Sequence, residues 1–345
     1  MADGGRVAGR SVLGRVTIAD VARAAGVSRT TVSHALNGLG RVDPRTRERV
    51  RAAARELGYR PSLRAQRLRR GESRTIGLVS SMPAAVAGGP SRLGFYMEVA
   101  AAAAETALGQ GFALVLVPPL EAGVPVESLD IDGAIAVEPE RADAVTELLL
   151  ERGIPVVTVG RQPGVELPHV DLHGLAVGEL LLDHLYQRGA RRIALLVGQA
   201  QRHSYLDVRA AYETFVGERG LPSMVMTAPE DGGEDAGYAS CVKLLERHPG
   251  VDAVCATVDA FAVGVVRALV EAGRRVPADV LVATRYDGLR ARTCDPPLTA
   301  VDLHLDRVAA EAVSLLLERL AGDTARAVVS GPDPVLVARA SSLRV

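Results

Sequence analysis

The sequence predicts a small all-α head followed by a larger α/β body with two lobes of parallel sheet. Three observations lead to this expectation. Apolar residues recur at helical spacing between residues 17 and 58, whereas short apolar runs alternate with longer helical patterns from residue 75 onward. At 345 residues the chain is long for one compact domain. The body alone, about 270 residues, is long for a single doubly wound sheet.

The head is expected to contain three short helices. Thr17 is a suitable N-cap for the first helix, because Asp20 follows it in the pattern of a capping box. Pro44 suits the first position of the third helix, where a missing N–H costs nothing. Glycines end all three patterns. The expected helices and their caps are 18–25 after Thr17, 29–36 after Ser28, and 44–57 after Asp43.

The first two helices are joined by a tight turn, and the second begins with small polar residues that can touch base edges. This pattern indicates a helix-turn-helix that binds DNA. The head is also basic: residues 1–74 hold 17 arginines and six acidic residues, a net charge of +11. The remainder holds 23 basic and 35 acidic residues, a net charge of −12. A basic head on an acidic body favours polyanion binding by the head alone.

The body shows strand and helix patterns in alternation, which indicates parallel sheets covered by helices on both faces. Ligands of such sheets bind in crevices at the carboxyl ends of the strands. The expected strands are 76–80, 113–117, 134–137, 156–159, 193–197, 253–257 and 280–283. The expected helices are 94–108, 142–152, 175–188, 208–219, 237–247, 261–272 and 305–320.

These patterns divide the chain into four segments. Residues 62–70 form a possible two-turn helix, which is marginal in water without a partner and therefore suits a hinge that forms only when docked. The expected segments are a flexible leader at 1–15, the helix-turn-helix domain at 16–61, a hinge at 62–74, and the body at 75–345.

Several other classes of protein are disfavoured. No run of eighteen apolar residues supports a membrane span, and residues 1–15 lack the long apolar run of a secretory signal. The spacing of Cys241, Cys255 and Cys294 favours free thiols over a disulfide framework or a zinc site. No dinucleotide-binding, Walker A, zinc-protease or serine-hydrolase motif occurs, so we expect neither an enzyme nor a cofactor. A cytoplasmic, nucleoid-associated protein is expected.

The run VTIADVARAAGVSRTTVSHALNGLGRVDPRTRERVRAAARELGYRPS resembles the DNA-binding domain of the lac repressor (LacI/GalR) family of transcriptional regulators. Looser similarity continues through RAQRLRRGESRTIGLV, VDAVCATVDAFAVGVVRALVEAGRRVPADV, RYDG, PPLTAVDLHLDRVAAEAVSLLL and VLVARASS. The resemblance implies a hinge helix and a two-lobed body similar to periplasmic sugar-binding proteins, with three chain crossings between the lobes. It also implies a dimer or tetramer on a pseudo-palindromic operator of double-stranded DNA, most often as a repressor.

The resemblance assigns DNA contacts to particular residues of this chain. Arg29, Thr30 and His34 match the positions that contact bases, and a forked arginine suits the O6 and N7 of guanine. Ala65 and Leu68 match the hinge, where Leu68 would wedge into the minor groove; packing in the dimer interface is the alternative. For Thr31 simple packing is the alternative, and Ser28 is expected to be both cap and contact. The positions that match phosphate contacts are Ser28, Thr31, Ser33, Asn37 and Thr46.

The resemblance also implies an effector between the lobes: a sugar, a sugar derivative or a nucleoside-like molecule. Two departures bear on its identity: Arg285 stands where the family's GFD motif has glycine, and Val258 replaces an asparagine. A salt bridge or a helix cap is the alternative for each polar residue, and a place in the core is the alternative for Phe95. The residues implied in effector binding are Arg209, Asp287, Asp259, Phe95 and His203.

Helix 94–108 carries small residues that suit close packing on a second subunit, with packing on its own sheet as the alternative. No leucine heptads follow the body, so a dimer is expected in place of a tetramer. Two other functions compete with a regulator. An enzyme is disfavoured by the missing catalytic motifs, and a solute-binding receptor by the missing secretory signal and the DNA-reading head.

Overall fold

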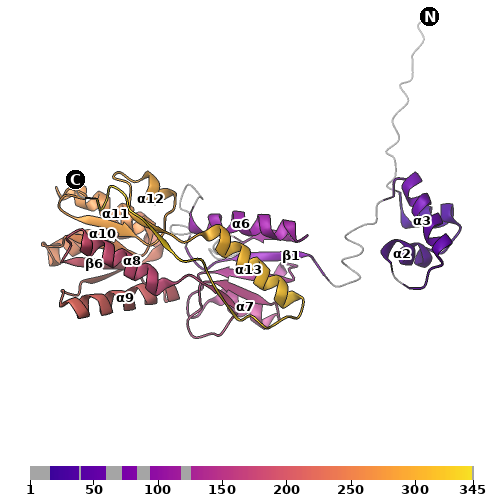
Figure 1. Cartoon of the computed structure of the whole chain (residues 1–345), viewed down its shortest axis with the longest axis horizontal. Helices are drawn as coiled ribbons and strands as arrows, with labels where there is room; N and C mark the ends of the chain where they lie inside the picture. Colours follow the sequence, from indigo (N-terminus) through magenta and orange to yellow (C-terminus); the bar gives the residue numbers. More distant parts are fainter. Residues whose placement is uncertain (1–15, 39, 60–71, 84–93, 118–125, 344–345) are drawn as a thin grey trace, which may run out of the picture. The chain divides into compact units, whose positions relative to one another are not determined.

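The computed structural model describes residues 16–38, 40–59, 72–83, 94–117 and 126–343 (Figure 1). The chain divides into two compact units, residues 1–73 and residues 74–345, which are described separately below. The predicted leader, most of the predicted hinge, and the predicted DNA contacts Ala65 and Leu68 lie outside the described residues.

The head is a bundle of three helices, as predicted: α1 (Ile18–Ala25), α2 (Arg29–Asn37) and α3 (Pro44–Glu56). The caps are the predicted ones. The Asp20 carboxylate accepts from both the backbone N–H of Thr17, at 3.0 Å, and its hydroxyl, at 2.7 Å. The Asp43 carboxylate accepts from the backbone N–H of Thr46 at 3.0 Å. Each cap satisfies a donor that the first helical turn cannot pair internally.

One valine from each helix forms the centre of the head's small core. Val21, Val32 and Val50 are fully buried and are surrounded mainly by alanines. Arg49 of α3 joins the third helix to the first, because its Nε donates to the carbonyl of Ala25 at 3.0 Å, at the end of α1. The core is therefore tied by packing and by one long-range hydrogen bond, while the first turn of α2 stays at the surface.

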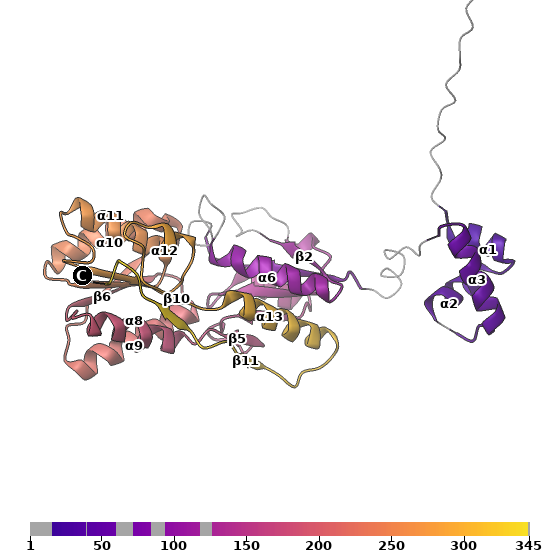
Figure 2. The ribbon, with the colours of Figure 1, turned by 45° about the horizontal axis from the view of Figure 1, so that its top comes forward.

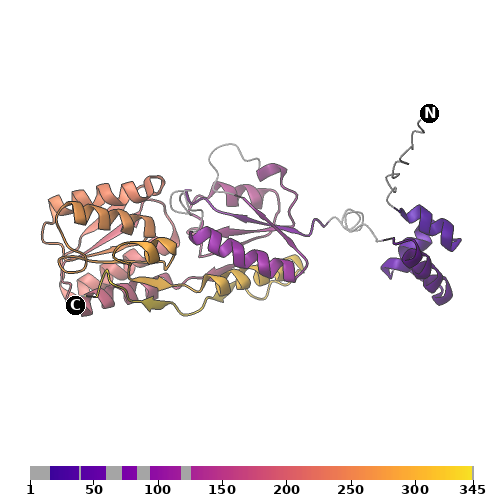
Figure 3. The ribbon, with the colours of Figure 1, turned by 90° about the horizontal axis from the view of Figure 1, so that it is seen from above.

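The body has two lobes (Figures 1 and 3). The N-lobe sheet is parallel throughout and has the strand order β11-β5-β4-β3-β1-β2. Its strands are β1 (Thr75–Val79), β2 (Ala113–Leu116), β3 (Gly133–Val137), β4 (Val156–Val159), β5 (His169–Asp171) and β11 (Val328–Ser330). Its other elements are α6 (Phe95–Gly109), η2 (Val126–Ser128), α7 (Ala144–Glu151) and α13 (Leu305–Leu320).

The two faces of this sheet are covered unequally. Alternate strand residues such as Leu78 and Ile135 point into the large core with α6 and α13. Their neighbours, such as Val79 and Ala134, point into a smaller core with α7. The small residues of α6 therefore pack on their own lobe, which is the alternative to subunit packing that the sequence left open: Val99, Ala100, Ala103 and Ala107.

The C-lobe has a parallel sheet of order β7-β6-β8-β9, with one helix pair on each face (Figure 3). The strands are β6 (Ile193–Gly198), β7 (Val225–Ala228), β8 (Ala253–Ala256) and β9 (Leu281–Thr284). The pairs are α8 (Gly174–Gln187) with α9 (His203–Arg219), and α10 (Gly233–Arg247) with α11 (Asp259–Glu271). An antiparallel ribbon, η3 and one short helix complete it: β10 (Ala300–Asp302), β12 (Val335–Val337), η3 (Glu230–Gly232) and α12 (Leu289–Thr293).

The chain crosses between the lobes three times, so each lobe is discontinuous in sequence (Figure 2). The first two crossings use the same tetrapeptide, Val-Asp-Leu-His, at 170–173 and 301–304. In both, the aspartate accepts from the backbone N–H of the histidine, at 2.9 Å and 2.8 Å. Both histidines have a left-handed backbone and begin the next helix, α8 or α13. The third crossing starts at Gly331, whose carbonyl lies 2.9 Å from His173 Nε2.

The predicted strands and helices all form, with shifts of a few residues at their ends. The largest shift is in α9, which begins at His203 and not at Val208. The sequence patterns do not predict the short strands β5, β7, β10, β11 and β12 or the short helix α12. The strands β5, β10, β11 and β12 have only three residues each, which is too few to show a periodicity.

Two glycines allow α10 and α11 to pack closely. A Cβ at Gly264 would lie 2.0 Å from the Glu234 carbonyl oxygen, and one at Gly237 would lie 2.4 Å from that of Phe261. We therefore expect Gly264→Ala to lower the free energy of unfolding by about 1–3 kcal/mol through overpacking. In contrast, a Cβ at Gly217 in α9 meets nothing within 4 Å, so Gly217→Ala should raise it by about 0.5–1 kcal/mol. Urea denaturation tests this; equal effects would contradict the packing.

Candidate DNA-reading face and interlobe site

The first turn of α2 combines side chains that hold the helix with side chains that are free. Ser28 Oγ accepts from the backbone N–H of Thr31 at 3.1 Å, and the hydroxyls of these two residues lie 2.8 Å apart. Arg29 and Thr30 are exposed. Within the described part of the head, neither has a hydrogen-bond or ion-pair partner. Their polar groups are therefore available to a ligand at the start of the helix.

His34 lies one turn after Thr30 on the same face of α2. It is half-buried, and the backbone of Gly40 packs against it. Gly40 has a φ of +66°, and a Cβ there would lie 2.9 Å from His34 Nδ1. A residue with a side chain would be strained and would push the imidazole away. Gly40 therefore holds His34 in place beside the free end of the helix.

The other predicted phosphate contacts differ in how accessible they are. Ser33 is only 8% exposed, and its hydroxyl accepts from Asn37 Nδ2 at 3.3 Å. Thr46 lies at the start of α3, where Asp43 binds its backbone N–H. Ser33 therefore offers less surface to a phosphate than the exposed Ser28 does.

In the body, the contact between the lobes centres on Arg202, the N-cap of α9, which is 1% exposed. Its Nε and Nη2 donate to Glu230 of the C-lobe at 3.1 Å and 3.0 Å, and Tyr205 Oη donates to the same carboxylate at 2.5 Å. Its Nη1 donates to Ser81 Oγ of the N-lobe at 3.1 Å and to the Glu138 carbonyl. Burial alone would lower the pKa of Arg202. Its hydrogen bonds to Glu230 and the negative charge of that carboxylate raise the pKa by more, so the guanidinium stays charged.

A second buried charge pair also crosses between the lobes. Glu138 directly follows β3 of the N-lobe. Its Oε2 accepts from Ser204 Oγ at 2.5 Å and lies 3.2 Å from Arg285 Nη2, both in the C-lobe. The Arg285 guanidinium lies 5.6 Å from the ring centroid of Phe95 and 5.7 Å from that of Tyr205. The arginine that replaces the family's glycine is therefore part of the interlobe contact.

Phe95 and Tyr286 form the aromatic part of this contact. Their ring centroids lie 5.3 Å apart at 75°, an edge-to-face arrangement across the two lobes. Tyr286 Oη also donates to Glu98 at the start of α6. Burial raises the pKa of Tyr286, and its bond to Glu98 adds to the shift. Phe95, one of the implied effector residues, thus lies between the lobes and is 5% exposed.

The predicted effector ligands Asp287 and Asp259 both lie in the C-lobe, where arginines pair with them. Asp287 Oδ1 is 2.5 Å from Arg339 Nη1, and its Oδ2 is 3.4 Å from Arg292 Nε. Asp259 Oδ1 is 3.6 Å from Arg290 Nη1. Burial raises the pKa of Asp259. Salt bridges, the alternative weighed for both residues, are thus present, and a role in ligand binding stays a prediction.

The structure does not bring Arg209 to this contact. Its side chain is half-exposed on α9, and its Nε donates to Glu213 one turn later at 2.9 Å. It lines a hollow of about 120 Å³ beside Gln199 and Tyr205. His203, expected in a loop, is instead the first residue of α9, 3.3 Å from Asp207 Oδ1. The signal that points to Arg202 is its place between strand β6 and helix α9, at the carboxyl end of a strand, where ligands of such sheets bind.

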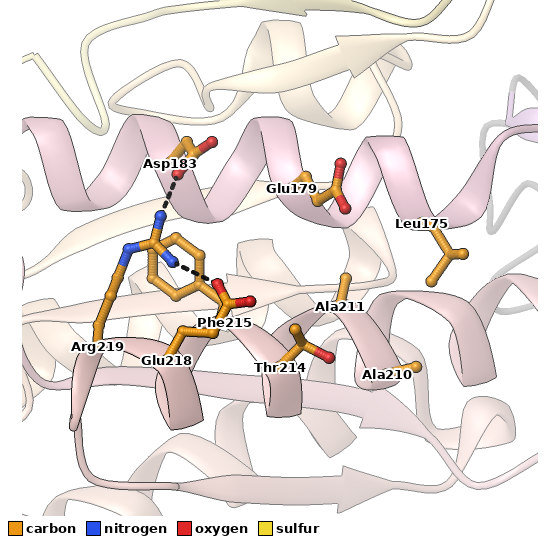
Figure 4. Close-up of a pocket in the computed structure, with 9 residues that line it drawn as sticks. All are labelled: Leu175, Glu179, Asp183, Ala210, Ala211, Thr214, Phe215, Glu218 and Arg219. Atoms are coloured by element: carbon orange, nitrogen blue, oxygen red, sulfur yellow. Dashed lines mark hydrogen bonds and ion pairs between the residues drawn. The ribbon is translucent and has the colours of Figure 1, made fainter.

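A groove of about 360 Å³ runs between α8 and α9 on the C-lobe (Figure 4). At one end Arg219 bridges Asp183 and Glu218, at 3.2 Å and 3.5 Å, and lies over the ring of Phe215. None of the predicted effector residues lines this groove. Nor is any group of three metal-ligating side chains in the described ranges placed to hold a metal ion.

Comparison with known proteins decides the family. The model of the bacterial regulatory proteins of the lacI family matches residues 17–62, and a periplasmic binding protein-like domain matches residues 182–342. The regulator CelR of Thermobifida fusca is 32% identical over 326 residues, 91% of this chain and 94% of its own. This chain belongs to the LacI family. It is a DNA-binding transcriptional regulator with an effector-binding domain, and not an enzyme.

Other relatives and solved structures agree with this LacI-family membership. The repressor PurR of Haemophilus influenzae is 30% identical over 88% of this chain and 91% of its own. The lac repressor dimer bound to operator and the anti-inducer ONPF superposes with a TM-score of 0.76 at 25% identity, covering 95% and 99% of the two chains. A CelR–cellobiose complex superposes with a TM-score of 0.71 at 30% identity, covering 95% and 100%. The predicted family and fold class are confirmed.

The two arginines of α9 provide a matched test of the interlobe contact. Arg202→Met leaves the buried Glu230 without its positively charged partner, so it should lower the free energy of unfolding by about 3–5 kcal/mol. Arg209→Met removes only a half-exposed pair and should change it by about 0–1 kcal/mol. Urea unfolding followed by circular dichroism measures both. Similar losses in the two variants would show that the Arg202 network is not buried as described.

Proposed function

We propose that this regulator is a repressor that binds a pseudo-palindromic operator as a homodimer, and that a small molecule bound between the lobes controls it. The observation that carries the proposal is the free first turn of α2, in a unit with a large excess of arginine. The names of its relatives support it: PurR is a transcriptional repressor, and the lac repressor structure is a dimer bound to operator.

In the proposed complex, the start of α2 enters the major groove. Arg29 reads a guanine through its O6 and N7, and Thr30 and His34 contact neighbouring base edges. Ser28 and Thr31 contact phosphates, which set the register of the helix and carry no sequence information. The remaining phosphate contacts in the proposal are Ser33, Asn37 and Thr46.

The hinge completes the proposed DNA interface. Leu68, with Ala65 one turn before it, would enter the minor groove from each subunit and unstack the central base step. Arginines surround Leu68 in the sequence, at positions 64, 67, 69 and 70, and would bind the flanking phosphates. Because each subunit contributes one leucine, unstacking of the central base pairs depends on the homodimer.

The proposed effector site lies where the two lobes meet, beside Phe95, Asp259 and Asp287. The name of the CelR–cellobiose complex favours a sugar for that relative, and we extend to this chain a sugar, a sugar derivative or a nucleoside-like molecule. Arg209 and His203, both on α9, belong to the proposed site, and we add Arg202, the N-cap of the same helix, because it lies between the lobes. The proposed location is the cytoplasm, in association with the nucleoid.

No helix in the described residues is both long and apolar enough to cross a membrane. The proposed partners are DNA, the effector and the second subunit, and they do not include a membrane.

A pair of arginines in the head tests base reading. Arg29→Ala should reduce discrimination between the operator and variants changed at one guanine by about 1–3 kcal/mol, a factor of about five to 150. Arg55→Ala is the control, because Arg55 lies nine residues beyond Thr46, about 13 Å along α3. Footprinting on selected genomic fragments finds the site, and gel-shift titration measures both variants. Unchanged base preference in Arg29→Ala, or no protected site for the wild type, would overturn the proposal.

A further inference from the structure

Glu138 is an N-lobe residue whose carboxylate binds two C-lobe side chains, Ser204 and Arg285, which together we call the receptor. It is 3% exposed, and both of its described carboxylate partners, Ser204 Oγ at 2.5 Å and Arg285 Nη2 at 3.2 Å, belong to the C-lobe. Ser204 is the second residue of α9, and Arg285 directly follows β9. The carboxylate therefore bridges the lobes as a bound ligand would.

The backbone of Glu138 is strained in order to place this carboxylate. Its φ is +50°, in the left-handed region that residues other than glycine seldom adopt. Such a conformation persists only where its surroundings enforce it. Gly160 at the end of β4 makes room for the carboxylate, since a Cβ there would lie 2.7 Å from Oε1. Contacts from both lobes therefore hold Glu138 in this conformation. Ser204 and Arg285 hold its carboxylate, and Val159 and Arg202 hold its backbone.

The groups that hold Glu138 have the chemistry of an anion receptor. The Arg285 guanidinium is 5% exposed and lies near the Phe95 and Tyr205 rings, so water screens its charge poorly. The hydroxyl of Ser204 adds a donor. Ser204 also lies in the first turn of the 17-residue helix α9, whose positive end favours negative charge.

The neighbouring carboxylates pair most closely with other arginines, and the interaction of Arg285 with Asp259 is weaker than that of Arg290. Glu230 is bound to Arg202 through two nitrogens, at 3.1 Å and 3.0 Å, and Asp259 lies 3.6 Å from Arg290. If the lobes separate, Glu138 leaves Arg285, whose only other described bond goes to the Thr257 carbonyl at 3.3 Å. A guanidinium in such a site binds an anion strongly, because an unpaired charge there is costly.

We propose that Ser204 and Arg285 form the binding site for a carboxylate or phosphate group of the effector, and that Glu138 is its built-in competitor. Anion binding and closure of the lobes through Glu138 then exclude each other. An anionic effector holds the lobes in a geometry different from the one described here. This inference rests on the proposed function, because it specifies the effector of the same body.

Calorimetric titration of the full-length protein with inorganic phosphate tests the site, with D-glucuronate as the carboxylate probe and glucose as the neutral control. Glu138→Ala should bind one or both anions at least about tenfold more tightly than the wild type, and Glu138→Gln should fall between them. Phosphate binding without glucuronate binding would assign the site to a phosphate, and the reverse to a carboxylate. Glucose binding should not change.

Two further variants make the test specific. Adding Arg285→Met to Glu138→Ala should abolish the gained anion affinity. Glu147→Ala, which removes an exposed carboxylate of α7 in the same lobe, should leave anion affinity at the wild-type level. Circular dichroism confirms folding, and the isosteric Glu138→Gln serves if Glu138→Ala does not fold.

Anion affinity that is the same in Glu138→Ala, Glu138→Gln and wild type, or that survives the loss of Arg285, would overturn the inference. Operator titration of the same samples separates this failure from failure of the proposed function. An intact operator complex with no anion site would contradict only the inference, whereas absence of any operator complex would contradict the proposed function.

Discussion

The body of this regulator depends on one constraint: charges buried between its lobes must be paired. Arg202 and Arg285 of the C-lobe and Glu138 of the N-lobe are each at most 5% exposed. Burying an ion costs several kcal/mol unless charge and hydrogen bonds compensate. Here the compensation comes from both lobes at once, so the lobes cannot separate without leaving a charge unpaired. A geometry that responds to a ligand needs such a discrete contact, which is either made or broken.

The head differs from the body, because in its described residues the polar helix ends are paired within the unit and two polar side chains of α2 are left free. Its core is small, with one central valine from each helix, and its N-caps use side-chain oxygens. Caps contribute about 1 kcal/mol each, which matters for a bundle of this size. With helix ends satisfied internally, Arg29 and Thr30 keep their polar groups for another molecule. The head is thus suited to read DNA, whereas the body is suited to change its own geometry.

Sequence patterns were sufficient for the helices of both units and for the buried strands, because burial leaves a strong periodicity. They failed for the three-residue strands such as β10, whose partner β12 lies far along the chain. The resemblance assigned the effector arginine to Arg209, which stays a prediction. The patterns did not show that Arg202 is the N-cap of α9, because they expected this helix to start at residue 208 and not at His203. Neither the left-handed backbone of Glu138 nor its contact with Arg285 can be read from local patterns, because the partners are 147 positions apart.

The central claim, that paired charges hold the lobes together without a ligand, is best tested by a distance between the lobes. Spin labels at Glu105→Cys on α6 and Lys243→Cys on α10 occupy exposed positions of the two lobes. Cys294→Ser removes the accessible native thiol, while burial raises the pKa of Cys241 and Cys255 to about 12 and protects them. Pulsed electron–electron double resonance on the ligand-free, spin-labelled protein, with the charge pairs intact, should give one narrow distance distribution. A broad or two-peaked distribution would contradict the claim.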